Sequence, residues 1–138
     1  MSHSLGNDAV VTEKDAAVVG EMLAASRRKD WDRVAELLDP EVVWSLPGKS
    51  RISGDAVGRK AVVERARAID AAKLTTDPQH LHIGSRSIIA TIHNTAETPL
   101  PLDEWLALVF TVRSGLITTI DTHLTDVPML ERFYAATA

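Results

Sequence analysis

The order in which helix-like and strand-like segments follow one another constrains this 138-residue chain more than any other feature. Apolar residues recur at helical spacing in four segments, which predicts helices over residues 12–29, 31–38, 59–72 and 127–136. Valine, isoleucine, threonine and tryptophan gather in five others, which predicts strands over residues 41–46, 79–83, 85–96, 102–113 and 116–125. Helices that precede a run of strands indicate an α+β fold, with the helices packed on one face of an antiparallel sheet.

Local signals mark the boundaries of several segments. Asp126 followed by Pro128 is typical of a helix start, because proline is tolerated in the first helical turn. Ser114-Gly115 predicts a tight hairpin turn between the last two strands. Residues 49–57 are polar and contain glycine, so we expect a loop there, and we expect a break over residues 75–78.

Composition excludes several classes of function. The chain has no cysteine, which excludes disulfides, thiolate catalysis and cysteine-ligated zinc. A net charge of −4 does not attract a phosphate backbone, so we expect no nucleic-acid partner. No apolar run approaches the ~20 residues of a membrane span, so we expect no membrane partner. The absence of cysteine fits the cytoplasm, which is the location we expect. We expect residues 1–11 to be a flexible leader and residues 12–138 to form a single domain.

The predicted elements suggest a shape and an assembly. A curved antiparallel sheet with three helices packed on its concave face would form a cone-shaped barrel whose mouth admits a small molecule. The strand over residues 102–113 is apolar on both faces, as Trp105, Val109 and Phe110 indicate. A face exposed to water would alternate more cleanly between apolar and polar residues. We therefore expect a homodimer that forms through the outer sheet face.

Three groups of residues carry a resemblance to a known superfamily. They are Lys29-Asp30-Trp31 with Val34, Leu37 and Leu38, then Val43-Trp44-Ser45-Leu46-Pro47-Gly48 followed by Gly58-Arg59-Lys60-Ala61-Val62, and Gly115-Leu116-Ile117 followed by Leu124-Thr125-Asp126. Their order and spacing resemble the nuclear-transport-factor-two-like superfamily, which includes ketosteroid isomerases, limonene epoxide hydrolase and the SnoaL-like polyketide cyclases. Because this fold hosts many activities, the resemblance implies a fold rather than a reaction.

The resemblance to ketosteroid isomerases places three pocket positions on this chain. The general base of those enzymes would match Ser45, the oxyanion-binding tyrosine would match Met22, and the neighbouring aspartate would match Leu108. All three residues differ from the isomerase pattern, so steroid isomerisation by that mechanism is not expected. The positions themselves are still implied to face a pocket.

The candidate catalytic residues are His93, Asp121 and His123. His93 matches the arginine of limonene epoxide hydrolase, and an imidazole exchanges protons near neutral pH; the alternative is a histidine in the core or on the outer sheet face. The resemblance implies a last-strand base near Thr122, which adjoins Asp121. Asp121 and His123 share a strand face, because they are two residues apart. If that face is inward they form an acid–base pair; if it is outward they make surface or interface contacts, and Thr122 and Leu124 line the pocket.

The candidate substrate-binding residues form a second set. They are Ser45, Trp44, Met22, Leu108, Thr122 and Leu124. Ser45 has no adjacent base in the sequence, so we expect a hydrogen-bond donor and not a nucleophile. His80 and His82 share a strand face and are the alternative metal ligands, but their strand holds no carboxylate. We expect no metal and no cofactor.

These observations predict a protein with a small-molecule pocket. The expected activity is cofactor-free acid–base chemistry on a small, mostly apolar organic ligand, by an isomerase, polyketide cyclase, dehydratase or epoxide-hydrolase-like enzyme. The basis is a small number of polar residues on an apolar scaffold, as ligand pockets have. The alternative is a non-catalytic ligand-binding or dimerisation module of the same fold.

Overall fold

The computed structural model describes residues 11–137, so the predicted leader lies almost entirely outside the described residues. The helices are α2 (Glu13–Arg27), α3 (Trp31–Glu36), α4 (Arg59–Ala71) and α5 (Val127–Ala136). The strands are β1 (Leu38–Leu46), β2 (Gly54–Val57), β3 (Thr75–Ile83), β4 (Ile88–Ala96), β5 (Leu102–Arg113) and β6 (Leu116–Leu124). None of the helices in this part of the chain has the length and hydrophobicity needed to cross a lipid bilayer.

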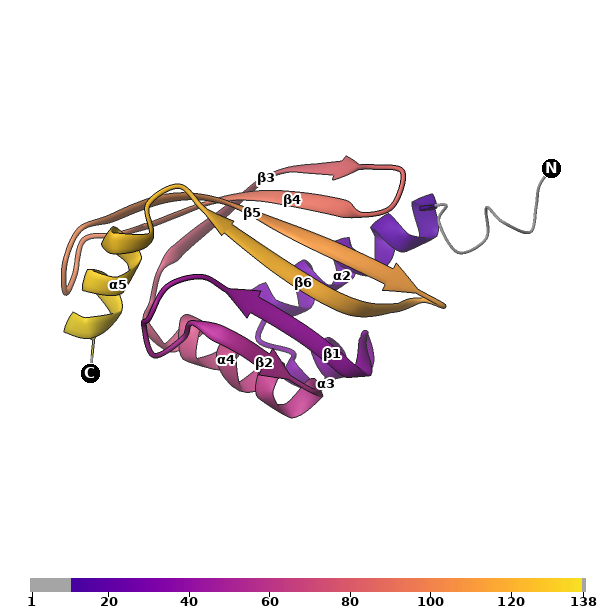
Figure 1. The fold of residues 1–138 in the computed structure, drawn as a ribbon, viewed down its shortest axis with the longest axis horizontal. Helices are drawn as coiled ribbons and strands as arrows, with labels where there is room; N and C mark the ends of the chain where they lie inside the picture. The colour runs from indigo at the N-terminus through magenta and orange to yellow at the C-terminus, as the bar shows by residue number, and fades with distance from the viewer. Residues whose placement is uncertain (1–10, 138) are drawn as a thin grey trace.

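The strands form one curved sheet in the order β2-β1-β6-β5-β4-β3. Neighbouring strands are antiparallel except β1 and β6, which run parallel. In Figure 1, α2, α3 and α4 lie on one side of the sheet, and α5 lies at one end. The expected α+β fold with a curved sheet is confirmed. The sheet is not closed into a barrel, however, because β2 and β3 remain edge strands.

Two segments that were expected to be irregular are edge strands. The predicted loop over residues 49–57 contains β2, which pairs with the end of β1. The predicted break over residues 75–78 is the first half of β3, which pairs with β4 up to a register shift after Pro78. Edge strands tolerate proline and glycine, because one side of their backbone makes no ladder hydrogen bonds. The turn-forming residues in these segments therefore do not prevent strand formation.

A β-bulge in β6 determines which of its residues face the helices. The register between β5 and β6 shifts, and Thr118 is the extra residue on β6. Ile117 and Ile120 are both buried, although three positions separate them and a regular strand would point them to opposite faces. Beyond the bulge, Thr122 is buried on the inner face with Ile120, and Asp121 is exposed on the outer face.

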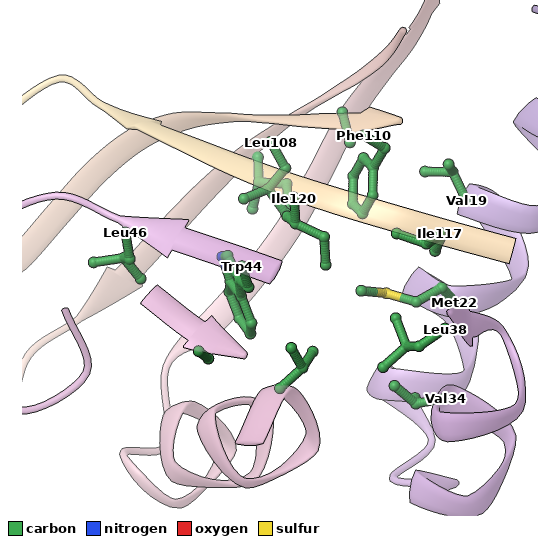
Figure 2. Packing of buried hydrophobic residues seen from close by; sticks show 14 of the residues in the cluster. Val19, Met22, Val34, Leu38, Trp44, Leu46, Leu108, Phe110, Ile117 and Ile120 are labelled. Atoms are coloured by element: carbon green, nitrogen blue, oxygen red, sulfur yellow. The ribbon is translucent and has the colours of Figure 1, made fainter. Parts of the chain in front are cut away.

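The space between the helices and the inner sheet face has a filled end and a hollow end. At the filled end, Val19 of α2 lies close to Phe110 and Ile117 of the sheet, and all three are fully buried. Figure 2 shows these side chains together and Trp44 and Leu46 of β1 farther along the sheet. Trp44 and Leu46 line a cavity, so the hollow end is where a ligand site can form.

Candidate functional site

The helices and the inner sheet face enclose a cavity of about 360 Å³. This volume falls within the range of about 300–1,000 Å³ that small-molecule sites occupy. Every described helix and every strand except β2 contributes to the lining. Most of the lining is apolar, with side chains such as Leu23, Val62, Ile69, Ile92 and Leu108. The polar side chains that reach the interior are few, and each is held by a different element.

One hydrogen bond within the cavity joins β1 to β6. The indole Nε1–H of Trp44 donates to Thr122 Oγ1 at 2.7 Å, and the Thr122 residue is only 4% exposed. Behind the indole, the guanidinium of Arg65 lies 5.2 Å from the Trp44 ring centroid and donates to the Trp44 carbonyl at 2.7 Å. These contacts fix the indole from two sides. They also make Thr122 an acceptor for Trp44, so its own hydroxyl hydrogen can donate to a ligand.

Tyr134 contributes a phenol to the cavity from α5. Burial raises the pKa of Tyr134 to about 12, although the guanidinium of Arg51, 5.4 Å from the ring centroid, acts in the opposite direction. The phenol is therefore neutral throughout the physiological pH range. A neutral phenol in an apolar cavity is a hydrogen-bond donor for a ligand oxygen and not a base.

Asn94 and Glu104 are directly opposite each other on β4 and β5. Glu104 is 1% exposed, and its Oε2 accepts hydrogen bonds from the Thr125 hydroxyl at 2.7 Å and from the Asp126 backbone N–H at 3.1 Å. Burial raises the pKa of the Glu104 carboxyl group, and these two hydrogen bonds offset that effect in part. Asn94 lines the cavity. Its Oδ1 and the Glu104 Oε1 are both buried without a hydrogen-bond partner among residues 11–137.

The charged side chains of the lining belong to exposed residues. Arg27 and Asp70 line the cavity and are exposed, and Lys29 Nζ lies 3.7 Å from Asp70 Oδ2. No other charged residue lines the cavity in the described part of the chain. The charged groups that a ligand contacts are therefore exposed to water. The groups that it contacts farther inside the cavity are all neutral. Burying an unpaired charge in such an interior costs several kcal/mol.

Five of the six predicted substrate-binding residues lie on the cavity lining. They are Met22, Trp44, Leu108, Thr122 and Leu124. Ser45 is the exception, because it pairs with Asp121 and lines a second, more open hollow together with Asp121 and His123. This hollow adjoins the cavity, since Leu46, Thr122 and Leu124 line both. Ligand contact by the five lining residues stays a prediction.

The three predicted catalytic residues do not line the cavity, so of the two orientations considered the structure has the outward one, and a catalytic role for them stays a prediction. His93 stacks on Trp105 with ring centroids 3.8 Å apart, and its Nε2 lies 2.5 Å from Asp103 Oδ1. His123 Nε2 lies 3.1 Å from Asp121 Oδ2, and the side chains of His123 and Asp121 are 62% and 59% exposed. The strands thus direct these groups to the outer sheet face, which is the alternative that strand parity left open.

The two alternative metal ligands, His80 and His82, lie near each other on β3. Their ring centroids are 5.9 Å apart. Among residues 11–137, no three histidine, cysteine, aspartate or glutamate side chains gather as a set of metal ligands. His80 and His82 therefore have no third ligand in that part of the chain.

Sequence reasoning missed several polar groups of the site, among them Asn94, Glu104 and Tyr134, and also Asp70 on the cavity lining. A signal for Glu104 was present, because it shares strand parity with Leu106 and Leu108 and is thus a carboxylate within an apolar row. Asn94 shares a face with other inward residues of β4 by the same parity. Tyr134 has no comparable signal, since its place depends on how α5 packs against the end of the sheet.

Comparisons with solved structures agree with this architecture. Bal32a, from a soil-derived mobile gene cassette, matches with a TM-score of 0.82 and 27% identity, over 93% of this chain and 99% of its own. An NTF2-like protein from Burkholderia xenovorans matches with a TM-score of 0.77 and 16% identity, over 91% and 98% of the two chains. An LEH-like epoxide hydrolase from M. tuberculosis matches with a TM-score of 0.69 and 19% identity, over 90% and 91%. A search of curated proteins finds no significant match.

The family comparison covers most of the elements that build the cavity. The model of the SnoaL-like domain matches residues 19–120, which extend from α2 into β6. The structural neighbours share the NTF2-like fold. The resemblance that the sequence motifs indicated is thus confirmed, and the chain belongs to the SnoaL-like domain family.

Proposed function

We propose that this protein binds one small, mostly apolar organic molecule in the cavity between the helices and the sheet. The observation that carries the proposal is a cavity of about 360 Å³ in which an apolar lining surrounds Asn94, Thr122 and Tyr134. Apolar contact supplies most of the binding free energy, and a few polar groups orient the ligand. Because the interior groups are neutral, the buried part of the ligand is neutral as well.

The proposed ligand carries an oxygen that accepts a hydrogen bond. Tyr134 is a neutral donor, because burial holds the pKa of its phenol at about 12. The Thr122 hydroxyl accepts from Trp44 and retains its own hydrogen for donation. A carbonyl or ether oxygen between such donors would satisfy them, whereas a pure hydrocarbon would leave them unpaired. An aryl ketone such as acetylnaphthalene is therefore a suitable probe, with naphthalene as its matched hydrocarbon.

Titration of the wild type and of Tyr134→Phe with these two probes tests the proposal. We expect saturable binding with one site per chain. Loss of one hydrogen bond of about 1 kcal/mol should weaken acetylnaphthalene roughly fivefold in Tyr134→Phe. Naphthalene should bind both proteins equally, because it has no oxygen to pair with the phenol. Isothermal titration calorimetry measures both affinities, and non-saturable uptake of both probes would contradict an enclosed site.

Proton-transfer catalysis in the same cavity is the second candidate function. It is favoured by Asp70, which is the carboxylate on the cavity lining and lies beside Lys29. An LEH-like epoxide hydrolase is among the proteins with this fold, and cofactor-free acid–base chemistry needs a carboxylate that reaches the ligand. Asp70 is the group that fits this need, since His93 and Asp121 face away.

Deuterium exchange of the acetylnaphthalene methyl group in heavy water measures this activity by NMR. A carboxylate that takes the methyl proton and returns a deuteron leaves the ketone otherwise unchanged. We expect the wild type to accelerate exchange and Asp70→Asn to lower the rate about 100-fold, the typical contribution of a general base. Glu64→Gln, an exposed substitution on α4 outside the lining, is the matched control. Binding without accelerated exchange would instead establish a non-catalytic binding module.

We also propose that the protein forms a homodimer through the outer face of β4 and β5. Three register pairs build this face, namely Ile89 with Val109, Thr91 with Ala107, and His93 with Trp105. Trp105 is 49% exposed, which is a large apolar area for an unpartnered surface. The same face carries hydrogen-bond donors and acceptors, as the pairs of His93 with Asp103 and His123 with Asp121 indicate. A patch with both kinds of group is able to pair with a copy of itself about a two-fold axis.

A further inference from the structure

Two buried oxygens at the β4–β5 ladder lack a donor. Asn94 and Glu104 are register partners on the inner sheet face, and side chains in such pairs have Cβ atoms about 5 Å apart. Asn94 Oδ1 and Glu104 Oε1 are both buried, and neither has a hydrogen-bond partner among residues 11–137. Two acceptor oxygens cannot satisfy each other while the carboxyl group is ionised. A single proton between them satisfies both.

We infer that Glu104 is a positioning residue that carries a proton on Oε1 and donates it to Asn94 Oδ1. The other carboxyl oxygen is already saturated, since Oε2 accepts from the Thr125 hydroxyl at 2.7 Å and the Asp126 N–H at 3.1 Å. Asn94 lines the cavity, so fixing its oxygen against Glu104 turns its amide N–H₂ toward the ligand. Glu104 thereby makes the polar end of the cavity a donor site.

This arrangement deepens the proposed function, on which its role in ligand choice rests. An Asn94 side chain with its N–H₂ inward selects a ligand with a carbonyl-type acceptor and disfavours one whose only polar group is a donor. An ionised Glu104 would instead accept from the Asn94 N–H₂ and leave Oδ1 facing the cavity. The protonation state of Glu104, which does not line the cavity, thus determines whether the ligand must offer a hydrogen-bond acceptor or a donor.

The charges around Glu104 favour the neutral acid. Burial is the largest cause that raises its pKa, and the Asp126 carboxylate at the start of α5 acts in the same direction. Asn94 on β4 and Thr125 after β6 are uncharged. The pKa of Glu104 is higher in the folded protein than in the unfolded chain. The bound proton therefore stabilises the folded protein fully at pH values below the ordinary pKa of a glutamate. That stabilisation is lost as the pH rises through the folded-state pKa.

Glutamine and leucine at position 104 separate the possible roles of this residue. Glutamine has the shape of the neutral acid, because its N–H₂ can donate to Asn94 and its oxygen can accept from Thr125 and Asp126. Leucine has a similar size and makes none of these hydrogen bonds. We expect Glu104→Gln to remove the fall in unfolding free energy that belongs to this group as the pH rises above the ordinary pKa of a glutamate. Glu97→Gln, an exposed loop glutamate, should leave that fall unchanged.

Infrared spectroscopy detects the proton directly and needs no ligand. At neutral pH the wild type should show the carbonyl stretch of a protonated carboxyl group, and Glu104→Gln should lack it. In Asn94→Leu the same band should move to higher frequency, because the acid loses its acceptor. Absence of the band in the wild type, or a pH dependence that Glu104→Gln leaves intact, overturns the inference.

Titration with acetylnaphthalene then tests the effect on the cavity. Its affinity should fall at least about fivefold in Glu104→Leu, as expected for the loss of one donor, and glutamine should restore it. If no probe binds any variant, the proposed function fails while the infrared and stability results still decide the protonation of Glu104. If the probe binds the wild type and Glu104→Leu equally, the positioning role fails and the pocket stands.

Discussion

Ala66→Phe is expected to reduce the affinity for acetylnaphthalene by at least about 100-fold, which corresponds to roughly 2.7 kcal/mol. Ala66 lies on α4 and contributes its methyl group to the cavity lining. A phenyl ring at this position occupies the space that the probe needs. The protein should still fold, because the ring enters a hollow that already exists and displaces no core side chain. Filling a cavity commonly raises stability by about 0.5–2 kcal/mol, so the melting temperature should be unchanged or higher.

Arg67→Phe is the matched control for this prediction. Arg67 is the next residue on α4, but it is exposed and does not line the cavity. The same aromatic ring at that position should leave the probe affinity within about twofold of the wild type, since surface substitutions change little. Calorimetric titration of the two variants side by side therefore separates loss of the cavity from a general effect of added hydrophobicity. Equal affinity of Ala66→Phe and the wild type would place the probe elsewhere.

Trp105→Glu is expected to convert the proposed homodimer to a monomer at all accessible concentrations. Trp105 is 49% exposed and stacks on His93 within the outer face. In a two-fold interface the new glutamate would be buried twice, and leaving a charge unpaired in an interface costs about 3–5 kcal/mol per site. Sedimentation velocity over a range of protein concentrations measures the dissociation.

Ile83→Glu serves as the control for the dimer. Ile83 ends β3 at the hairpin and is 53% exposed, so the same change removes a comparable apolar side chain away from the proposed interface. The control should sediment like the wild type. A wild type that is monomeric at every concentration, or a Trp105→Glu protein that dimerises as strongly as the wild type, would contradict assembly through this face.

The architecture could be predicted from sequence because its long elements have strong local signals. The span of α5 follows from Asp126 and Pro128, and β5 follows from an apolar run bounded by turns. The edge strands of the sheet could not be predicted as well. In β2 and the start of β3, glycine and proline indicate irregular structure, and pairing at the edge of a sheet overrides that local preference. The parallel contact of β1 with β6 is long-range and has no local signature.

The site could be predicted only in part, because strand parity is ambiguous without the bulge and the curvature. Thr122 and Leu124 were placed on the lining as one of two alternatives, and the structure has that alternative. His93 and Asp121 attracted attention by their chemistry, although the neighbouring residue in each case is the one that faces inward. Residue type alone therefore points to the wrong face of the strand at both His93 and Asp121. Tyr134 depends on tertiary packing, which no local pattern encodes.

Methyl chemical shifts of the isotopically labelled protein titrated with acetylnaphthalene test the ligand cavity most directly. An aromatic probe shifts the resonances of methyl groups that lie close to its ring. Ile92, Leu108 and Ile120 line the cavity, and Ile89 and Val109 alternate with them on the opposite face of the sheet. A probe in the cavity should shift the first three residues strongly and leave the other two nearly unchanged. Shifts confined to Ile89 and Val109, or no saturable shift at all, would contradict a small-molecule site between the helices and the sheet.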